Sequence, residues 1–334
     1  MSSADTNLFD VTIVGGGPVG LFAAFYAGLR GLKTKIIDAS AELGGQLVTL
    51  YPEKYVYDVA GLPKILAKDL ARDLASQAQQ FKPTVCLNAK VATLEKRDDG
   101  SWKITTEGST EHLSRTVVLA IGAGASAPKK LTVPYNAAFE GVSVFYAVTE
   151  REKFRDKNVL IIGGGDSAVD WANDLSQVAK HVCLIHRSDK FRAVQTSVDE
   201  MTRKGVDVKT FHELKQVNGT EKLEGAVIFD NRTKAEETIQ VDAILINIGF
   251  SINLGFLKAW GLTLQNNAIV VNEKMETNLD GVYAVGDICT HAAKLKLIAT
   301  GVGEAAIAVN FAATKINPSA KAFPGHSSNL DLKV

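Results

Sequence analysis

The chain has 334 residues, of which 46% are hydrophobic, and this is enough for two cores at roughly 150 residues per domain. Basic and acidic residues balance at 37 each, so the net charge gives no reason to expect a nucleic-acid ligand. No apolar run approaches a membrane span, residues 1–10 lack a signal-peptide pattern, and three scattered cysteines favour a reducing compartment. We therefore expect a cytoplasmic protein that binds no membrane.

A strand, a glycine turn and a helix follow one another near the start of the chain. Residues 11–14 are a β-branched run, 21–29 suit a buried helix, and 35–37 are predicted to form the next strand. The turn lets the backbone approach a pyrophosphate at the positive end of the helix, and an acid after the second strand is placed to bind ribose hydroxyls. The candidate dinucleotide-binding residues are Gly15, Gly17, Pro18, Gly20 and Asp38.

The same order of elements returns in the middle of the chain. A strand over 158–162 leads into a second glycine turn, a helix begins at 169, and a strand over 181–186 follows. Cations occupy the end of that strand, where an acid would otherwise sit, and guanidinium groups suit a 2′-phosphate, so NADPH is expected rather than NADH. The candidate NADP-binding residues are Gly163, Gly165, Asp166, Ser167, Ala168, His186, Arg187 and Arg192.

Antiparallel strands are predicted after each of these modules. Residues 85–95 and 102–106 flank a turn and precede a strand over 115–121, whereas 209–217, 223–229 and 238–241 precede a strand over 243–248. We predict an α/β protein with two doubly wound, Rossmann-like nucleotide-binding domains, each with an inserted antiparallel β-meander. The expected first domain joins residues 1–120 to 250–334, and the second covers 121–249.

A third signal lies near the C-terminus. A strand over 281–285 ends in Gly286-Asp287, before a helical run over 301–316. Beside two dinucleotide modules, Asp287 becomes a candidate for binding the ribityl hydroxyls of a flavin. The N-terminus of the following helix could then stabilise the negative charge of the reduced flavin.

Together these segments resemble the thioredoxin reductase-like flavoproteins over nearly the whole chain. The likeness is clear in residues 163–192, but positions 147–150 read Ala-Val-Thr-Glu where thioredoxin reductases carry Cys-x-x-Cys. The subgroup without these cysteines is the ferredoxin-NADP reductase of the thioredoxin reductase-like type. That resemblance implies FAD and NADPH as cofactors, an acidic iron-sulfur ferredoxin as partner, and a homodimer. One departure is Ser188, where thioredoxin reductases have a second arginine, so a less strict preference for NADPH is expected.

Finer motifs carry over from this subgroup residue by residue. Residues 44–54 resemble the stretch that wraps the flavin, so Gln46 is expected to contact it and Tyr51 to stack on it. The tail 323–328 resembles a C-terminal extension that covers the opposite flavin face, which assigns stacking to His326 and a flavin contact to Ser328. Val91 completes the expected FAD-binding residues. Tyr51 and His326, the two expected stacking residues, are assigned as the catalytic residues. Hydride transfer depends more on orienting the nicotinamide and flavin rings than on an acid or a base.

Two other functions stay open from the sequence. One is an NADPH diaphorase that reduces quinones or peroxides, for which Cys289 would be the reactive thiol to test. The other is a redox sensor that binds both nucleotides without turnover. If ferredoxin is the partner, a local basic surface should receive it. The candidate docking residues are Lys129, Lys130, Arg151, Lys153, Arg155, Lys157, Lys294 and Lys296.

Overall fold

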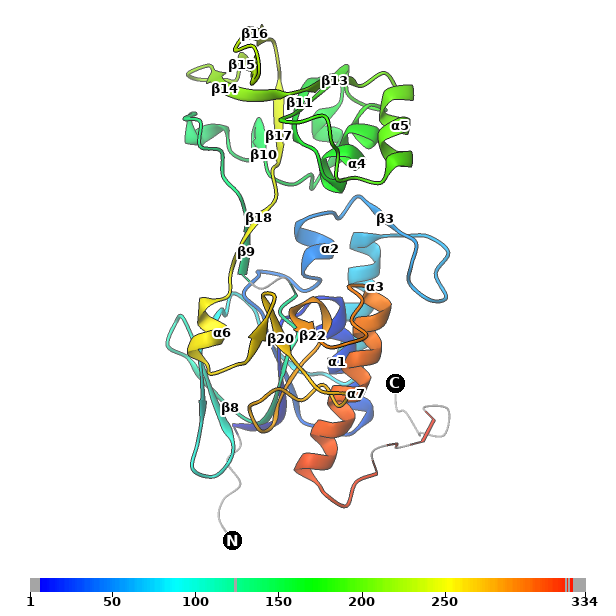
Figure 1. Ribbon diagram of the computed structural model, residues 1–334. Helices are drawn as coiled ribbons and strands as arrows, with labels where there is room; N and C mark the ends of the chain where they lie inside the picture. The colour runs from blue at the N-terminus through cyan, green and yellow to red at the C-terminus, as the bar shows by residue number, and fades with distance from the viewer. Residues whose placement is uncertain (1–6, 123–124, 322, 324, 327–334) are drawn as a thin grey trace. The chain divides into compact units, whose positions relative to one another are not determined.

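The computed structural model describes residues 7–122, 125–321, 323, 325 and 326. The chain divides into two compact units, one formed by Met1–Ala125 with Ile252–Val334 and the other by Ser126–Ser251. It leaves the first unit in β9 (Ala125–Pro128) and returns in β18 (Phe250–Asn253), and these two short strands pair with each other (Figure 1). Of the helices described, none combines the length and the apolar character that crossing a membrane requires.

A mixed seven-stranded sheet forms the core of the first unit. Its order is β5-β2-β1-β8-β7-β6, and β21 pairs with β8. The strands at the β5 end are parallel, and their β-branched residues are buried, as expected for a sheet covered on both faces. The strands are β1 (Leu8–Val14), β2 (Thr34–Ile37), β5 (Thr84–Cys86), β6 (Val91–Lys96), β7 (Trp102–Thr106), β8 (Glu111–Leu119) and β21 (Val282–Ala284).

The predicted single strand over 85–95 is wrong, because it is two strands in different parts of this sheet. β5 pairs parallel with β2, whereas β6 pairs antiparallel with β7. Asn88 lies between them with φ +52°, a left-handed conformation that ends a strand and that asparagine tolerates better than most residues. The antiparallel β6 and β7 therefore extend the main sheet.

Three long helices cover this sheet. α1 (Pro18–Leu29) packs against both α3 (Ala67–Gln79) and α7 (Ile298–Ile316), and small, fully buried residues such as Ala23 and Ala24 allow the close approach. α7 begins one turn earlier than the predicted start at residue 301. The shorter elements are α2 (Gln46–Thr49), β3 (Tyr55–Val56), β4 (Ile65–Leu66), α6 (Gly255–Ala259), β19 (Leu264–Gln265), β20 (Ala268–Val270), η3 (Gly286–Ile288) and β22 (Cys289–Thr290).

A five-stranded parallel sheet, in the order β10-β17-β11-β12-β13, forms the core of the second unit. Alternate residues of β11 face different layers: Ile161 packs with α4 and α5, and Leu160 packs with the antiparallel β14-β15-β16 sheet. The elements are β10 (Val144–Phe145), β11 (Asn158–Gly163), α4 (Asp166–Leu175), β12 (His181–His186), α5 (Gln195–Arg203), β13 (Asp207–Thr210), β14 (His212–Asn218), β15 (Gly225–Asp230), β16 (Glu236–Ile239), β17 (Ala243–Asn247), η1 (Ala137–Phe139) and η2 (Arg151–Phe154). The predicted fold class is confirmed.

Candidate functional site

The first glycine loop is tightly packed on one side and open on the other. A Cβ on Gly15 would lie 2.4 Å from the carbonyl oxygen of Ala120, and one on Gly20 would lie 1.9 Å from that of Gly15. Neither position can hold a side chain without moving the backbone. A Cβ on Gly17 would instead find its nearest neighbour at 3.9 Å, the Cα of Gly45. This leaves space at the N-terminus of α1, where Pro18 is the first helical residue.

Asp38 is fixed beside this loop at the end of β2. Its side chain is largely buried, with Oδ2 accepting from the backbone N–H of Gly16 at 2.5 Å and Oδ1 from that of Ser40 at 2.7 Å. A carboxylate has about four acceptor positions, so these two bonds orient the group without using its capacity. The remaining acceptor positions can receive ribose hydroxyls.

Gln46 and Tyr51 belong to one short segment, and each interacts with a distant part of the chain. Gln46 begins α2, and its Nε2 lies 3.3 Å from the position that a Cβ on Gly122 would occupy, just after β8. Tyr51 packs on the cluster that includes Leu47, and burial, followed by the charge of Asp287, raises the pKa of its phenol. The phenol is therefore neutral, and Asp287 is close to it. Gly122 follows β8 and Asp287 follows β21, so both lie at the carboxyl ends of paired parallel strands, the edge where doubly wound sheets bind ligands.

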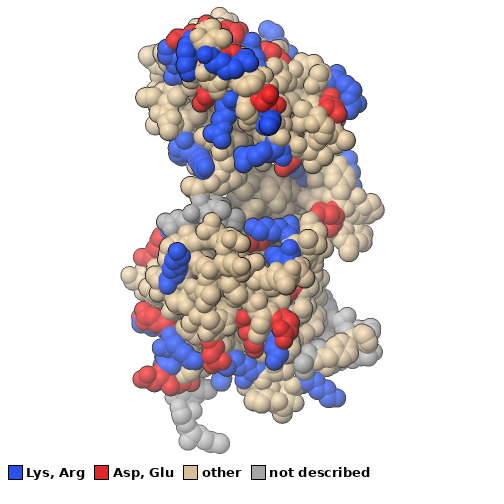
Figure 2. All heavy atoms as spheres, in the orientation of Figure 1, with Lys and Arg blue, Asp and Glu red and all other residues tan. Residues whose placement is uncertain are grey.

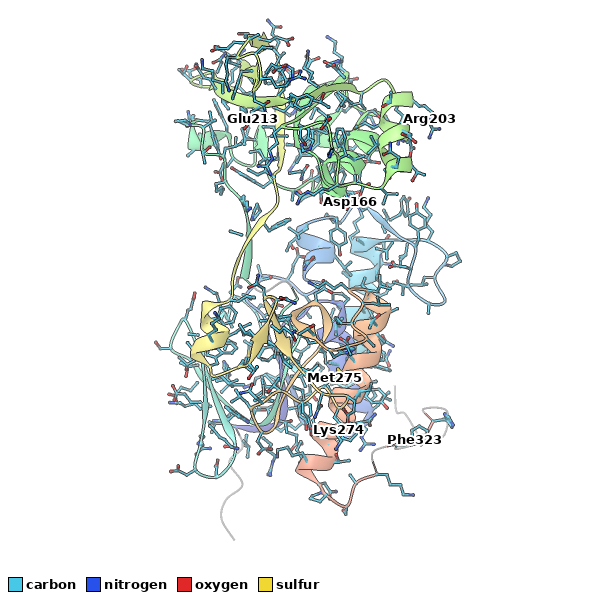
Figure 3. All side chains as sticks on the ribbon, viewed as in Figure 1. Asp166, Arg203, Glu213, Lys274, Met275 and Phe323 are labelled. Atoms are coloured by element: carbon cyan, nitrogen blue, oxygen red, sulfur yellow. The ribbon has the colours of Figure 1, made fainter. Side chains whose placement is uncertain are left out.

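The structure does not bring His326 to Tyr51. The exposed ring of His326 lies edge-on to Phe323 at 5.4 Å between centroids, and Phe323 is on the tail after α7 (Figure 3). Arg30, at the C-terminal end of α1, donates to the carbonyl of Lys321 at 2.8 Å and so holds the start of this tail. Ser328 lies outside the described residues. The side chain of Val91 is largely buried in the core of the first unit.

The second glycine loop repeats the open and closed faces of the first. A Cβ on Gly163 would lie 2.4 Å from the carbonyl oxygen of Asn247, whereas one on Gly165 would meet no atom within 4 Å. Asp166 begins α4 (Figure 3), and its Oδ1 accepts from the backbone N–H of Val194 at 3.2 Å. Ser167 is exposed and Ala168 is fully buried beneath the loop. The open face again lies at a helix N-terminus.

Residues 187–194 fold back onto this second loop. The backbone N–H of Arg192 donates to the carbonyl of Gly164 at 2.8 Å, and the ring of His186 lies directly against Gly164. The exposed side chains of Arg187 and Arg192 form no ion pair within the described ranges. Asn231 donates to the carbonyl of Arg187 at 2.9 Å, a support that sequence analysis missed because no local pattern marks it. Two cations are thus presented beside the open face.

Most of the predicted docking cations are paired with acids. On the face drawn in Figure 2, Lys and Arg lie among Asp and Glu in each unit. The prediction is wrong for Lys294, whose side chain is only 8% exposed and contacts Glu304. The other four pairs are exposed or half-exposed, and such ion pairs contribute little energy and can exchange partners. The pairs are Lys130–Glu140 at 2.5 Å, Arg151–Asp174 at 3.1 Å, Lys153–Glu150 at 3.0 Å and Arg155–Glu152 at 2.6 Å.

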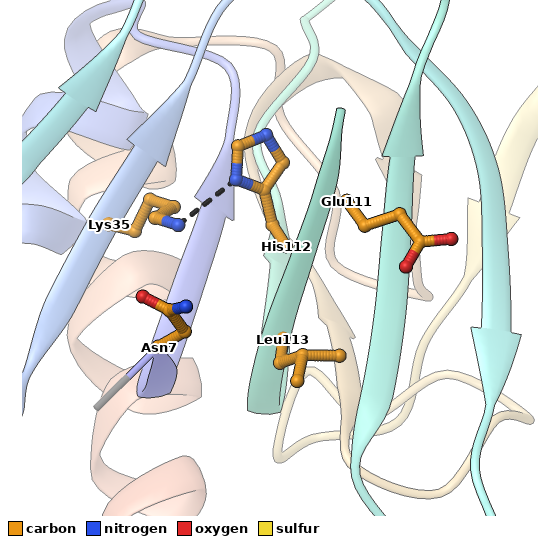
Figure 4. A pocket seen from close by; sticks show the side chains of 5 residues that line it. All are labelled: Asn7, Lys35, Glu111, His112 and Leu113. Carbon is orange, nitrogen blue, oxygen red and sulfur yellow. Dashed lines mark hydrogen bonds between the residues drawn. The ribbon is translucent and has the colours of Figure 1, made fainter. Parts of the chain in front are cut away.

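A separate cavity of about 440 Å³ lies near the amino ends of β2 and β8, away from the glycine loop (Figure 4). Lys35 donates to Nδ1 of His112 at 3.0 Å in this cavity, and both side chains are largely buried. Burial, followed by the charge of Lys35, lowers the pKa of His112. The residues that line it are Asn7, Lys35, Glu111, His112 and Leu113.

This pair predicts a pH dependence of stability. Because the pKa of His112 is lower in the folded chain, the unfolded chain binds the proton more readily. The contribution of His112 to the free energy of unfolding should be constant above about pH 6.5 and should lower the stability as the pH drops below it. In urea unfolding, the free energy of unfolding of His112→Gln should fall less with decreasing pH than that of wild type. The control His181→Gln, at an exposed position, should fall as much as wild type. Identical pH profiles for wild type and His112→Gln would contradict this assignment.

The chain belongs to the pyridine nucleotide-disulphide oxidoreductase family, whose model matches residues 9–310. It is 50% identical to a ferredoxin-NADP reductase of Halalkalibacterium halodurans over 98% of this chain and 99% of that protein. A ferredoxin-NADP reductase of Sulfurisphaera tokodaii is 49% identical over 97% and 98%. The crystal structure of T. acidophilum thioredoxin reductase matches with a TM-score of 0.79 at 27% identity, covering 92% of this chain and 99% of that one.

Proposed function

We propose that this chain is a flavoprotein reductase that binds FAD in the first unit and NADPH in the second, and passes electrons between NADP(H) and ferredoxin. The observation that carries the proposal is the pair of glycine loops, each closed against the sheet and open at a helix N-terminus. Relatives of about 50% identity that carry the name ferredoxin-NADP reductase support the assignment of the acceptor.

The residues of the first unit fit FAD. Space beside Gly17 suits a pyrophosphate, and Asp38 suits the ribose hydroxyls. The neutral phenol of Tyr51 offers a stacking surface, with Gln46 and Asp287 as polar contacts nearby. FAD, when bound, accepts hydride and can release electrons one at a time. The protein then has to bind and orient the two nucleotides and to exclude water, and it needs no nucleophile for this.

The second unit fits NADPH. The open face of Gly165 suits the pyrophosphate at the N-terminus of α4, and the exposed guanidinium groups of Arg187 and Arg192 suit the 2′-phosphate. The loop that carries these arginines is tied to Gly164 and to Asn231, which holds it beside the nucleotide. This arrangement favours NADPH over NADH.

The cysteines disfavour a thiol-based acceptor. All three lie within the described residues and are unpaired, and burial raises the pKa of both Cys183 and Cys289 to about 12. A protonated, buried thiol is a poor nucleophile, which weighs against Cys289 as a peroxide-reactive group. An external one-electron carrier such as an iron-sulfur protein needs no thiol of this chain.

We also propose a homodimer in which His326 serves the neighbouring subunit. The tail is held at Lys321, beside the C-terminal end of α1, whereas the glycine loop lies at the other end. α1 is about 18 Å long, and the residues from Lys321 to His326 extend at most about 18 Å. Within its own chain, His326 could therefore reach the first glycine loop only if the tail from Lys321 were fully extended. We infer that it reaches the flavin of the neighbouring subunit instead.

Light scattering of the holoprotein should give twice the chain mass of 35.8 kDa. Deletion of residues 322–334 should leave the protein dimeric and alter the visible spectrum of the bound flavin, because one stacking partner is lost. A monomer with full activity at the same concentration would contradict the dimer proposal.

The function is tested by steady-state oxidation of NADPH with different acceptors. We expect turnover with ferredoxin and none with thioredoxin, because a disulfide acceptor needs a dithiol that this chain lacks. Turnover with quinones but not with ferredoxin would make the protein a diaphorase. Absence of turnover with every acceptor would favour a redox sensor.

A further inference from the structure

A buried charged cluster, not identified from the sequence, lies beside η3. Its centre is Glu304 in α7, which is 4% exposed. The carboxylate accepts from Nζ of Lys294 at 2.7 and 2.8 Å, Nε2 of His291 at 3.1 Å, Sγ of Cys289 at 3.4 Å and the backbone N–H of Gly286 at 2.8 Å. A carboxylate and an ammonium can share a buried site only when they are paired and hydrogen-bonded in this way.

The donor atoms of this cluster also resemble a metal site. One atom each of Cys289, His291 and Glu304 lies within 4.8 Å of the others, and zinc uses these ligand types. However, the ammonium of Lys294 contacts both carboxylate oxygens, and burial, followed by the charge of Glu304, raises the pKa of the Cys289 thiol to about 12. The protein therefore supplies its own cation, and the cluster is better described as an ion pair with two further hydrogen-bond donors.

The cluster joins two elements that we propose face the flavin. Gly286 has φ +75° and directly precedes Asp287, so the bond from its N–H to Glu304 fixes the turn that presents Asp287. Gly301, in the first turn of α7, packs against this turn, since a Cβ there would lie 3.4 Å from the Cα of Gly286. One carboxylate thus links η3 with the N-terminal part of α7.

We propose that Glu304 is a positioning residue for FAD, because it fixes the turn that carries Asp287. Lys294 neutralises the carboxylate of Glu304, so the buried cluster adds no net charge beside the flavin. This inference rests on the proposed binding of FAD in the first unit. A reduced flavin carries more negative charge than an oxidised one. A lone carboxylate at Glu304 would therefore disfavour reduction, and a lone ammonium at Lys294 would favour it.

The test is the reduction potential of the bound flavin, measured anaerobically against a reference dye in holoprotein variants. Lys294→Met should lower the potential and Glu304→Gln should raise it, each by about a tenfold change in the reduced-to-oxidised ratio, or about 30 mV for a two-electron couple. The double variant should return close to wild type. A purely structural contact would weaken FAD binding in both single variants without shifts of opposite sign.

The matched controls are Lys315→Met and Asp280→Asn, which remove the same charges from an exposed pair at 2.5 Å. Lys315 is near the other end of α7, roughly 16 Å from Glu304 along the helix axis, so neither control should shift the potential. Shifts of the same sign in both single variants, no shift in either, or stoichiometric zinc in the purified protein would overturn the proposal. If Lys294→Met does not fold, the proposal is tested by the other two variants: Glu304→Gln should still raise the potential, and the double variant should return it close to the wild-type value. Failure of the wild type to bind FAD would instead refute the proposed function.

Discussion

Gly17→Val should give a folded protein that no longer retains FAD. Gly17 has φ −74° and ψ −178°, a conformation that valine also adopts, and the space around it is open. The new side chain would occupy the space proposed for the pyrophosphate. We expect FAD affinity to fall by about a hundredfold or more, equal to at least about 2.7 kcal/mol, as measured by flavin fluorescence during titration.

Gly165→Val provides the matched comparison in the second unit. Its φ of −101° and ψ of 178° also accept valine, and no atom would lie within 4 Å of the added Cβ. This variant should remain yellow and lose NADPH affinity by a similar factor. Loss of FAD from Gly165→Val, or its retention by Gly17→Val, would contradict the assignment of the two loops.

Replacing both Arg187 and Arg192 by alanine should remove the preference for NADPH. Each guanidinium can make a charge-assisted bond of about 1.5 kcal/mol or more to a 2′-phosphate, so kcat/KM for NADPH should fall roughly a hundredfold. The value for NADH, which lacks that phosphate, should stay within about threefold. Steady-state kinetics with both nucleotides measures the difference.

Arg203→Ala is the control for this double variant. Arg203 is an exposed cation in the same unit, at the end of α5 (Figure 3), and its removal should change neither nucleotide's kinetics. Equal losses for NADPH and NADH in the double variant would show that the arginines act on something other than the 2′-phosphate.

Strands that are buried on both faces were predictable from the sequence. The observed β11 and β12 match the predicted strands because their runs of Ile, Val and Leu allow few other structures. The strand over 85–95 was not predictable as two strands, because its division depends on the left-handed conformation of Asn88. That residue type permits such a conformation but does not require it.

The glycine loops were predictable because their spacing reflects local backbone geometry. The supporting contacts were not, because they join residues that only the folded chain brings together. Asn231 reaches Arg187 from a different sheet, and Glu304 reaches Gly286 from the next helix. The tail assignment at His326 came from resemblance alone and stays a prediction.

The most direct test of the central claim is a stopped-flow experiment on the purified holoprotein. Under anaerobic conditions, NADPH first reduces the flavin by two electrons. The reduced protein is then mixed with oxidised ferredoxin or, separately, with thioredoxin, and the flavin absorbance is recorded throughout. We predict fast reduction by NADPH and fast reoxidation by ferredoxin, with none by thioredoxin. A flavin that NADPH reduces but ferredoxin cannot reoxidise would contradict the account and leave both nucleotide sites in place.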